Sequence, residues 1–363
     1  MPDTEVKSLN DFPVFETKTA AKTTYKLEDP AERKRYFEEK AGPEIAFLRD
    51  YLATKTFVGF LLGPKNSGKG TYTKLLMEAV GAEHVAHLSV GDIVRSVHKD
   101  LETEEGKREL VAFLGKRYRG FMSIEQALDV ILGRDTKSLL PTEVILALVE
   151  REISRIGKKA IFIDGFPRHF DQVPYALYFR ELMDYRNDPD FFVFISVPEA
   201  VIDERMKYRV ICPTCQTPRN IKLLRTKTVG YDADADTYYL ICDNPDCPDP
   251  KRMVAKEGDE LGIEVIRDRI EADKKIMEQL LGLRGVPKVY LRNAVPVAEA
   301  DKIDEYELTP AYRFTREGAA VKVIEEPWTV TDEVGNESYS LLPAAVVTAL
   351  IKQTAQILGF TGQ

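Results

Sequence analysis

The chain has 363 residues, 44% of them apolar, which is enough to bury the core of one large domain or of two ordinary ones. Its net charge is −8 and its basic residues are scattered, so the electrostatic footprint of a nucleic-acid binder is missing and we expect small-molecule chemistry. No apolar run approaches the length of a bilayer-spanning helix, and the first residues, MPDTEVKSLN, lack the features of a signal peptide. We therefore expect a cytoplasmic protein with neither a nucleic-acid nor a membrane partner.

Residues 1–55 form a polar N-terminal arm. Within it, the stretch DPAERKRYFEEKAGPEIAFLRDYL is rich in helix formers and has a proline near its start. The pattern predicts one or two surface helices. The arm carries no motif that indicates chemistry, and its role is open.

Short apolar runs separated by helical stretches follow the arm. They read FVGFLLG, VAHLS, AIFID, FFVFISV and KVYL. Such runs are typical of buried parallel strands that are joined by crossover helices. Residues 56–295 are therefore predicted to form a doubly wound α/β domain with a five-stranded parallel sheet.

Two regions interrupt the alternation of strands and helices. Residues 93–140 are mostly helical in pattern, and residues 210–262 contain the cysteines, several prolines and the acidic stretch YDADAD. We expect both insertions to lie over the carboxyl edge of the sheet. After them, residues 296–363 form a C-terminal extension with a predicted hairpin, WTVTDEVGNESYSL, and a final amphipathic helix, AAVVTALIKQTAQIL.

A glycine-rich loop follows the first strand and precedes a helical stretch. Gly63, Gly68 and Lys69 fill the pattern G-x-x-x-x-G-K in the context that the pattern requires. Glycines let backbone N–H groups turn toward phosphate oxygens, and the lysine adds a charge that can follow a transferring group. An ordinary turn would need the strand, both glycines, the lysine and the helix to coincide by accident. The sequence thus predicts a P-loop whose cofactor-binding residues are Gly63, Asn66, Ser67, Gly68, Lys69, Gly70 and Thr71.

The end of this loop differs from the usual P-loop. Its hydroxyl comes one residue late, on Thr71, because Gly70 follows the lysine. One residue on a helix is a rotation of about 100°, so Thr71 is not assigned to Mg²⁺. The order Gly-Lys-Gly-Thr resembles that of adenylate kinases and other nucleoside monophosphate kinases. The resemblance covers roughly residues 56–295 and implies a P-loop kinase fold with a monophosphate-binding insertion at residues 93–140 and a lid at residues 210–262.

Three segments resemble the acceptor side of that family. LSVGDIVR implies a phosphate contact for Arg95, LLPTEV implies a segment that closes over the acceptor base, and DGFPRHFDQ implies that Arg168 holds the acceptor phosphate and Gln172 the base. Where the family usually has Thr for adenylate, this chain has Val90, which leaves UMP or CMP open as acceptors beside AMP. The substrate-binding residues implied are Val90, Arg95, Leu140, Gly165, Phe166, Arg168, Gln172 and Arg269.

Two further segments resemble the donor side. DERMKYR supplies Arg205, which is implied to lie against the donor adenine, and Arg209, which is implied to bind the donor phosphates. EVIRDRI supplies Arg269 as a further phosphate clamp. The arginine that usually precedes paired aspartates in the family's lid has no clear match here, and Lys256 is the candidate substitute.

These charges suit phosphoryl transfer, which needs in-line positioning and positive charge and requires no catalytic base. Asp164 ends the strand AIFID at the sheet edge where α/β folds bind ligands, and is placed to orient Mg²⁺. Asp92 could share that task or could cap a helix. The predicted catalytic residues are Lys69, Asp164, Arg168, Arg209 and Arg269.

The four cysteines have the spacing C-x2-C, 26 residues and C-x4-C. Four thiolates in such turns suit a tetrahedral Zn²⁺ with no open position, so Cys212, Cys215, Cys242 and Cys247 are predicted to hold a structural zinc. Free or redox-active thiols are the alternative. A lid of about fifty residues has little core of its own and benefits from such a metal.

Together these patterns predict a monomeric kinase that binds ATP and AMP, uses Mg²⁺ with ATP, and transfers the γ-phosphate reversibly to the monophosphate. A UMP or CMP kinase is the nearest alternative. A nucleic-acid-stimulated P-loop ATPase would use the cysteines as a zinc ribbon and would need basic and aromatic residues around them, but the segment DADADTYYLICDNPDC is strongly acidic. A non-catalytic nucleotide binder is a third possibility.

Overall fold

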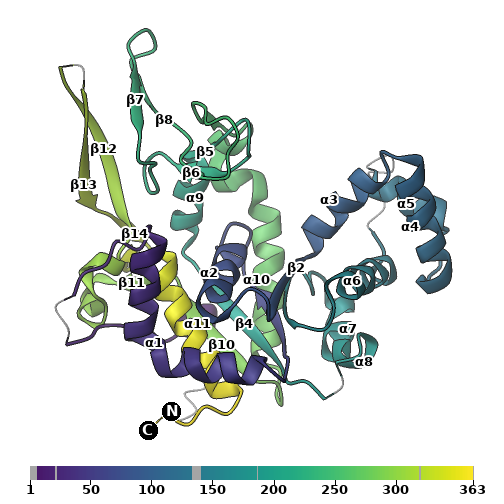
Figure 1. The fold of residues 1–363 in the computed structure, drawn as a ribbon. Coiled ribbons are helices and arrows are strands. Elements are labelled where there is room, and N and C mark those ends of the chain that lie inside the picture. The colour runs from purple at the N-terminus through teal and green to yellow at the C-terminus, as the bar shows by residue number, and fades with distance from the viewer. Residues whose placement is uncertain (1–5, 21–22, 133–139, 186, 319, 363) are drawn as a thin grey trace.

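A computed structural model describes residues 6–20, 23–132, 140–185, 187–318 and 320–362. Its centre is a parallel sheet with the strand order β10-β4-β1-β3-β2 (Figure 1). The strands are β1 (Val58–Leu62), β2 (Val85–Ser89), β3 (Ala160–Asp164), β4 (Asp190–Ser196) and β10 (Lys288–Arg292). All five apolar runs are therefore strands, as predicted, and the doubly wound α/β fold is confirmed.

Helices cover both faces of this sheet, which explains why its central strands are apolar without alternation. One face packs on α2 (Lys69–Val80) and α9 (Glu199–Lys207), and the other on α6 (Thr142–Ile156) and α10 (Arg267–Leu281). Every residue of β1 is buried. The short helices α7 (Val173–Leu177) and α8 (Phe179–Leu182) complete the second face. No helix among the described residues is long and apolar enough to cross a bilayer.

The insertion at residues 93–140, which we call the acceptor insertion, is helical as predicted. It contains most of α3 (Val90–Asp100), all of α4 (Glu104–Arg117) and all of α5 (Ile124–Ile131). Side-chain caps start each helix: Ser89 caps α3, Thr103 caps α4, and Ser123 forms a capping box with Gln126 at α5. Residues 133–139, including Leu139 of the segment LLPTEV, lie outside the described residues.

The insertion at residues 210–262, which we call the lid, consists of short strands. A three-stranded sheet joins β5 (Arg209–Ile211), β6 (Pro218–Asn220) and β9 (Val254–Ala255). A separate hairpin joins β7 (Val229–Asp232) and β8 (Thr237–Leu240). The irregular 3-10 segment η3 (Asp259–Ile266) leads from the lid into α10.

The N-terminal arm contains the predicted helix, and one side of that helix joins the core. Its helix α1 (Pro30–Leu52) is capped by Asp29 and kinks at Ala41, two residues before Pro43. One side of α1 is buried and packs on α2 and on the C-terminal helix α11 (Pro343–Ile357), as Figure 1 shows. The predicted helix is present and its exposed side faces solvent; nothing in the sequence indicated that its buried side packs on the other end of the chain.

Buried polar groups join the arm to the C-terminal extension. Glu307 is fully buried and accepts hydrogen bonds from Tyr36 Oη and Thr17 Oγ1, both at 2.5 Å. Lys40 Nζ, also buried, lies 2.5 Å from Asp304 Oδ2 and 3.7 Å from Glu307 Oε1. Because each buried charge has an opposite charge or a hydrogen-bond donor beside it, the two chain ends are fixed to each other.

The C-terminal extension contains two hairpins. The predicted one is formed by β14 (Thr329–Thr331) and β15 (Glu337–Ser340), and β15 also pairs with β11 (Ala294–Pro296). A second and longer hairpin, β12 (Pro310–Glu317) with β13 (Ala320–Pro327), was not expected from the sequence. It projects from the core beside β7 and β8 of the lid (Figure 1).

Candidate active site

The loop after β1 has the geometry of a phosphate cradle. Asn66 and Gly68 have positive φ values of 66° and 101°, so the backbone turns sharply before α2 begins. A Cβ atom on Gly63 would lie 2.9 Å from Ser67 Oγ, and a Cβ atom on Gly68 would lie 2.7 Å from the Tyr72 ring. Larger residues would therefore displace their neighbours. The turn presents its backbone N–H groups at the positive end of α2, where an anion is stabilised.

Polar groups within this loop point to a ligand rich in oxygen atoms. Asn66 Nδ2 and Ser67 Oγ are buried and make no hydrogen bond to the described residues. A buried polar group without a partner is costly, so such groups in a native site indicate a ligand or water. Lys69 Nζ donates to the carbonyl oxygens of Gly63 at 2.7 Å and Pro64 at 2.9 Å. The donors and the ammonium group suit a polyphosphate.

A pocket opens beside the loop at the carboxyl edge of the sheet. Its charged lining residues are Lys69, Asp164, Arg168, Arg269 and Asp273. Lys69 Nζ lies 3.7 Å from Asp164 Oδ1. The loop, the end of β3, the turn after β3 and helix α10 each contribute to this lining. Four of the five predicted catalytic residues thus meet in one pocket.

The cations around this pocket repel one another. Burial lowers the pKa of Lys69, against the effect of Asp164, and burial together with Arg269 lowers the pKa of Arg168. Burial also lowers the pKa of Lys65, and the neighbouring Arg269 acts in the same direction. Lowered pKa values mean that the charged forms are destabilised relative to water. A bound polyanion would stabilise them.

Asp273 is a pocket residue that the sequence analysis missed. It lies one helical turn after Arg269 on α10, so both side chains reach the same face. Burial raises its pKa, while Lys69 and Arg269 oppose that shift. The i, i+4 spacing from Arg269 is the signal that could have identified it. Asp164 and Asp273 together offer carboxylate oxygens of the kind that Mg²⁺ prefers.

The two donor-side arginines occupy different surroundings. Arg209 makes a bidentate ion pair with Asp259, at 2.5 and 2.8 Å, and its Nη1 lies 3.3 Å from Asn66 Oδ1 of the loop. Arg205 donates to Asn293 Oδ1 at 3.0 Å. Arg209 therefore stands between the lid and the loop, whereas Arg205 is bonded to a residue near the C-terminal extension. Their roles toward a donor nucleotide stay predictions.

The acceptor-side residues lie near the entrance to the acceptor insertion. Arg95 is 70% exposed and pairs with Asp92 on the first turns of α3, where Ser89 and not Asp92 is the cap. Val90 and Phe166 are buried, and Leu140 is half-buried. Arg95 does not join the pocket that Arg168 lines.

Gln172 is engaged within the protein. Its Oε1 accepts from the Arg168 backbone N–H at 2.8 Å, and its Nε2 donates to Thr142 Oγ1 at 3.3 Å. The side chain is buried, at 4% exposure. These bonds fix the DGFPRHFDQ turn, in which Gly165 has a φ of 83° and lies against the Arg168 guanidinium. The expectation that Gln172 reads a base stays a prediction.

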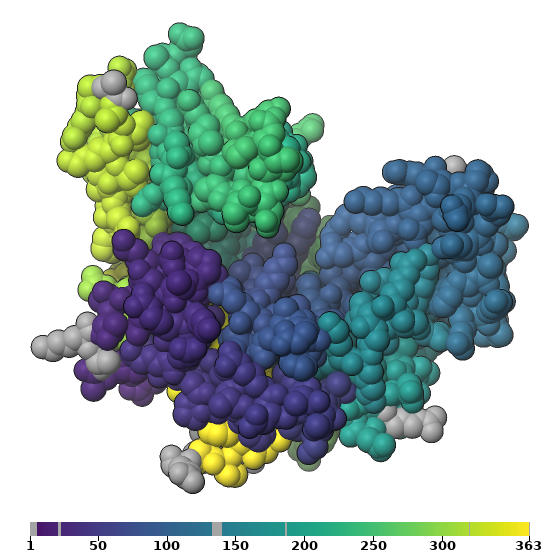
Figure 2. Space-filling view, in the orientation of Figure 1, coloured from purple at the N-terminus to yellow at the C-terminus, as the bar shows by residue number. Residues whose placement is uncertain are grey.

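The remaining predicted residues do not line the pocket. Gly70 and the exposed Thr71 lie in the first turn of α2. Lys256, the candidate substitute for the lid arginine, is exposed and close enough to Lys65 to lower its pKa. Figure 2 shows an open gap between the lid and the acceptor insertion, above the core that carries the loop.

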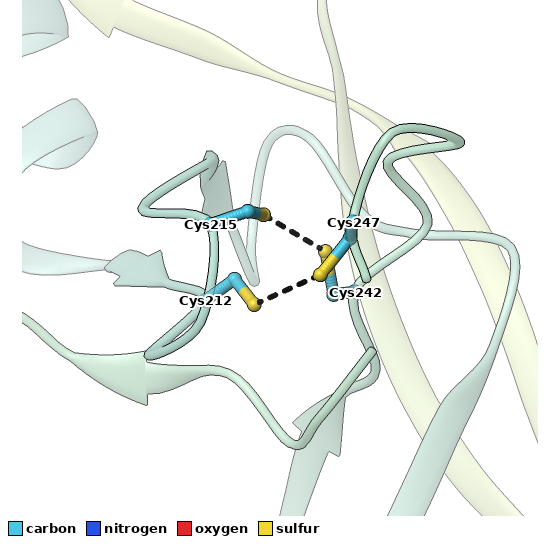
Figure 3. Close-up of side chains that lie close together, drawn as sticks. All are labelled: Cys212, Cys215, Cys242 and Cys247. Atoms are coloured by element: carbon cyan, nitrogen blue, oxygen red, sulfur yellow. Dashed lines mark hydrogen bonds between the residues drawn. The ribbon is translucent and has the colours of Figure 1, made fainter. Parts of the chain in front are cut away.

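The cysteines form one cluster in the lid (Figure 3). The Sγ atoms lie within 4.8 Å of one another, with 3.8 Å between Cys212 and Cys247 and 3.6 Å between Cys215 and Cys242. A tetrahedron of sulfurs at 2.3 Å from zinc has edges of about 3.8 Å, so the arrangement fits that ion. Hydrogen bonds from Thr217 lower the pKa of Cys215 to about 5, and burial raises the pKa of Cys242 to about 12. Metal binding would therefore release protons.

Comparison with known proteins gives the following matches. A family model described as an AAA domain matches residues 62–210. The adenylate kinase of Thermotoga petrophila is 31% identical over 167 residues, which are 46% of this chain and 64% of that protein. The adenylate kinase of Clostridium novyi is 31% identical over 171 residues, 47% of this chain and 67% of that protein. The adenylate kinase of Clostridium acetobutylicum is 28% identical over 242 residues, 66% of this chain and 89% of that protein.

Coverage of these relatives is partial. The chain spans 64% of the length of the Thermotoga petrophila protein and 59% of the length of the Thermotoga neapolitana adenylate kinase, to which it is 32% identical over 155 residues, 42% of this chain.

Proposed function

Because the chain belongs to the adenylate kinase family, we propose that it transfers the γ-phosphate of MgATP reversibly to AMP, giving two molecules of ADP. The observation that carries this proposal is the pocket in which Lys69, Arg168 and Arg269 approach one another beside the P-loop. Three cations from separate segments, at a loop with unsatisfied buried donors, match the charge of a transferring phosphoryl group.

The chain's own residues can do this chemistry by binding and positioning. Phosphoryl transfer passes through a loose transition state with charge on the equatorial oxygens, so fixed positive charge stabilises it. Lys69, held at the mouth of the loop by the carbonyl oxygens of Gly63 and Pro64, can follow the moving group. Arg168 and Arg269 flank the same space, and Arg209 extends over the loop from the lid. No general base is required.

Mg²⁺ would be held near Asp164, with Asp273 as a second carboxylate in the same pocket. The ion neutralises charge on the phosphates when it is bound with ATP. The four lid cysteines would hold a structural Zn²⁺ with no open coordination position. Its contribution would be to the folding of the lid.

AMP is the preferred acceptor in this proposal. The pocket implied by Val90, Leu140 and Phe166 is apolar and suits a purine, and Gln172 and Arg168 stand in one turn beside it. Val90 lacks the hydroxyl that the family's Thr would give, so AMP would bind more weakly here than to a family member with Thr at this position. Val90→Thr would therefore lower the KM for AMP. We also propose that the protein acts in the cytoplasm as a monomer, without a nucleic-acid or membrane partner.

One assay separates the proposal from its alternatives. Purified protein is given MgATP with AMP, GMP, CMP or UMP, or with no acceptor, and diphosphate formation is followed. We expect kcat/KM for AMP to exceed that for UMP or CMP by about a hundredfold or more, because a smaller pyrimidine leaves a gap in the apolar acceptor pocket. Equal turnover of UMP and AMP would refute AMP as the acceptor. Phosphate release without an acceptor would favour an ATPase.

A single substitution tests the role of the loop lysine. Lys69→Met should lower kcat by more than a hundredfold, about 2.7 kcal/mol or more of transition-state stabilisation, while far-ultraviolet circular dichroism stays unchanged. Lys74→Met, an exposed lysine on the next turns of α2, is the matched control and should keep full activity. Retention of more than about a tenth of kcat in Lys69→Met would refute this role.

A further inference from the structure

Asn293 occupies a junction between the donor side of the active site and the C-terminal extension. It lies between β10 and β11 and is fully buried. Its Oδ1 accepts from Arg205 Nη2 at 3.0 Å and from Ser340 Oγ at 3.1 Å. Its Nδ2 donates to Tyr72 Oη at 2.8 Å and to the Leu341 carbonyl oxygen at 3.3 Å. Both amide hydrogens and both oxygen lone pairs of the side chain are thereby used.

Two of these partners belong to the nucleotide-binding side of the molecule. Arg205 is the arginine that the resemblance to the family implies to lie against the donor adenine of the proposed reaction. Tyr72 lies beneath the P-loop, where its ring would be 2.7 Å from a Cβ atom on Gly68. Asn293 thus forms hydrogen bonds both with Tyr72, under the P-loop, and with Arg205, which is expected to contact the adenine base of the donor.

The other two partners belong to the C-terminal extension. Ser340 ends β15, and Leu341 follows it. The Leu341 backbone N–H also donates to the Asn293 carbonyl oxygen at 2.7 Å, while the Asn293 N–H donates to the Ser196 carbonyl oxygen at 2.9 Å. The backbone of Asn293 is therefore pinned between the end of β4 and the extension. Asn293 therefore has little freedom to rotate away from the Arg205 guanidinium, which donates a hydrogen bond to it.

We propose that Asn293 is a positioning residue for the donor nucleotide, which acts by holding the guanidinium plane of Arg205. This inference rests on the proposed function. A guanidinium is planar and carries five donors, so a fixed acceptor on one nitrogen selects the orientation in which its face can stack on a base. The proposal also gives the C-terminal extension a part in ATP binding, because Ser340 and Leu341 fix the amide that orients Arg205.

Asn293→Leu keeps the approximate size of the side chain and removes its hydrogen bonds. We expect the KM for ATP to rise about tenfold, the size of effect typical for loss of a hydrogen bond to a charged group, while kcat and the KM for AMP change less than about twofold. Asn293→Asp keeps an acceptor for Arg205 and Ser340, and should restore the KM for ATP to within about threefold of the original value. An equal rise in both KM values would overturn the proposal.

A second set of variants separates positioning from a general structural defect. If Asn293 acts through Arg205, adding Asn293→Leu to Arg205→Ala should leave the KM for ATP where Arg205→Ala alone puts it. Additive effects of the two substitutions would overturn the proposal. Ser340→Ala removes one hydrogen bond to Asn293 Oδ1 and leaves the Asn293 side chain in place. It should therefore raise the KM for ATP by only about twofold to threefold.

Calorimetric binding of ATP distinguishes failure of this inference from failure of the proposed function. ATP affinity that falls about tenfold in Asn293→Leu and recovers in Asn293→Asp supports the inference even if the protein forms no ADP from AMP, an outcome that would refute the proposed function alone. Unchanged ATP affinity in a folded Asn293→Leu, with its thermal unfolding recorded beside the unmodified protein, would overturn the inference alone.

Discussion

The lid and the acceptor insertion both stand over the carboxyl edge of the sheet, yet they are supported differently. The acceptor insertion shares the hydrophobic core of the sheet: Leu110, Leu114 and Leu128 are buried in the same cluster as Phe60 and Ile163. The lid has a small cluster of its own, formed by Cys212, Leu240, Cys242, Cys247 and Met253. The first insertion is therefore stabilised by the core of the domain, whereas the lid, from which Leu223 reaches that core, needs further support.

The lid also receives support from outside itself. The hairpin of β12 and β13 places Phe314 against the lid's cysteine cluster and 5.6 Å from the Tyr238 ring. The Arg225 guanidinium lies 5.2 Å from the Tyr312 ring, and the Tyr312 N–H donates to the Lys222 carbonyl oxygen at 2.7 Å. The acceptor insertion is held instead by ion pairs to its own neighbour α6, such as Arg151 with Asp100 at 2.7 Å.

This difference shows that two insertions in one sheet can be stabilised by different interactions. An element with little apolar area needs a metal or an external surface, because each ordered residue costs about 1–2 kcal/mol of backbone entropy. An element that continues the central core does not. Loss of the metal should therefore disorder the lid and leave the acceptor insertion ordered.

Loss of the metal should produce the largest difference in order between the lid and the acceptor insertion. In Cys242→Ser/Cys247→Ser, bound zinc measured by elemental analysis should fall from about one per chain to none. Limited proteolysis should then cut the lid and leave the acceptor insertion intact. Asp246→Asn, an exposed carboxylate in the same turn, is the control and should keep the metal. Protein purified without added metal that contains no zinc would contradict the four-thiolate site.

A core substitution in the acceptor insertion should affect the whole domain. Leu114→Ala should lower the free energy of unfolding, measured by urea denaturation, by about 2–4 kcal/mol. The substitution leaves a cavity in the core that the acceptor insertion shares with the sheet. Val111→Ala on the same helix, where the side chain is 38% exposed, should cost under about 1 kcal/mol. If Leu114→Ala increased amide exchange in the acceptor insertion alone, the shared core would not couple it to the sheet.

The smallest effect should come from the hairpin. Phe314→Ala should lower the free energy of opening of β7 and β8 by about 1 kcal/mol, because it removes one aromatic contact, and should leave global unfolding unchanged. Hydrogen exchange resolved by peptide measures this. Arg313→Ala is the matched control, since that side chain is 58% exposed and pairs with Glu326 across the hairpin. Equal exchange in both variants would show that the hairpin does not support the lid.

The position of the charged pocket at the carboxyl edge of the sheet was predictable from the sequence for a physical reason. Buried parallel strands are apolar without interruption, and their carboxyl ends meet at one edge, so Lys69 after β1 and Asp164 at the end of β3 were expected at the same edge. They are neighbours because β1 and β3 pair directly. The cysteine spacing likewise predicts a four-sulfur cluster, which the lid contains. Arg168 and Arg269 were placed by resemblance, and the pocket brings them to the same edge.

Other features depend on contacts between distant segments. The sequence of α1 shows a helix but not its burial, because its partner α11 lies some 300 residues later. The β12–β13 hairpin has a modest alternation of apolar residues, and what it rests against is the lid. Asp273 looks like any acidic residue on a helix until α10 is docked beside the loop.

The sequence by itself determined the P-loop, the five strands, the helical acceptor insertion and the four-cysteine cluster, because each is set by local spacing or by periodic burial. Only the tertiary structure decided that the two chain ends pack together, that a hairpin supports the lid, and that Asn293 joins Arg205 to the extension. Those outcomes require side chains far apart in sequence to meet. A single sequence carries no local signal for such meetings, because many surfaces satisfy the same apolar and polar pattern.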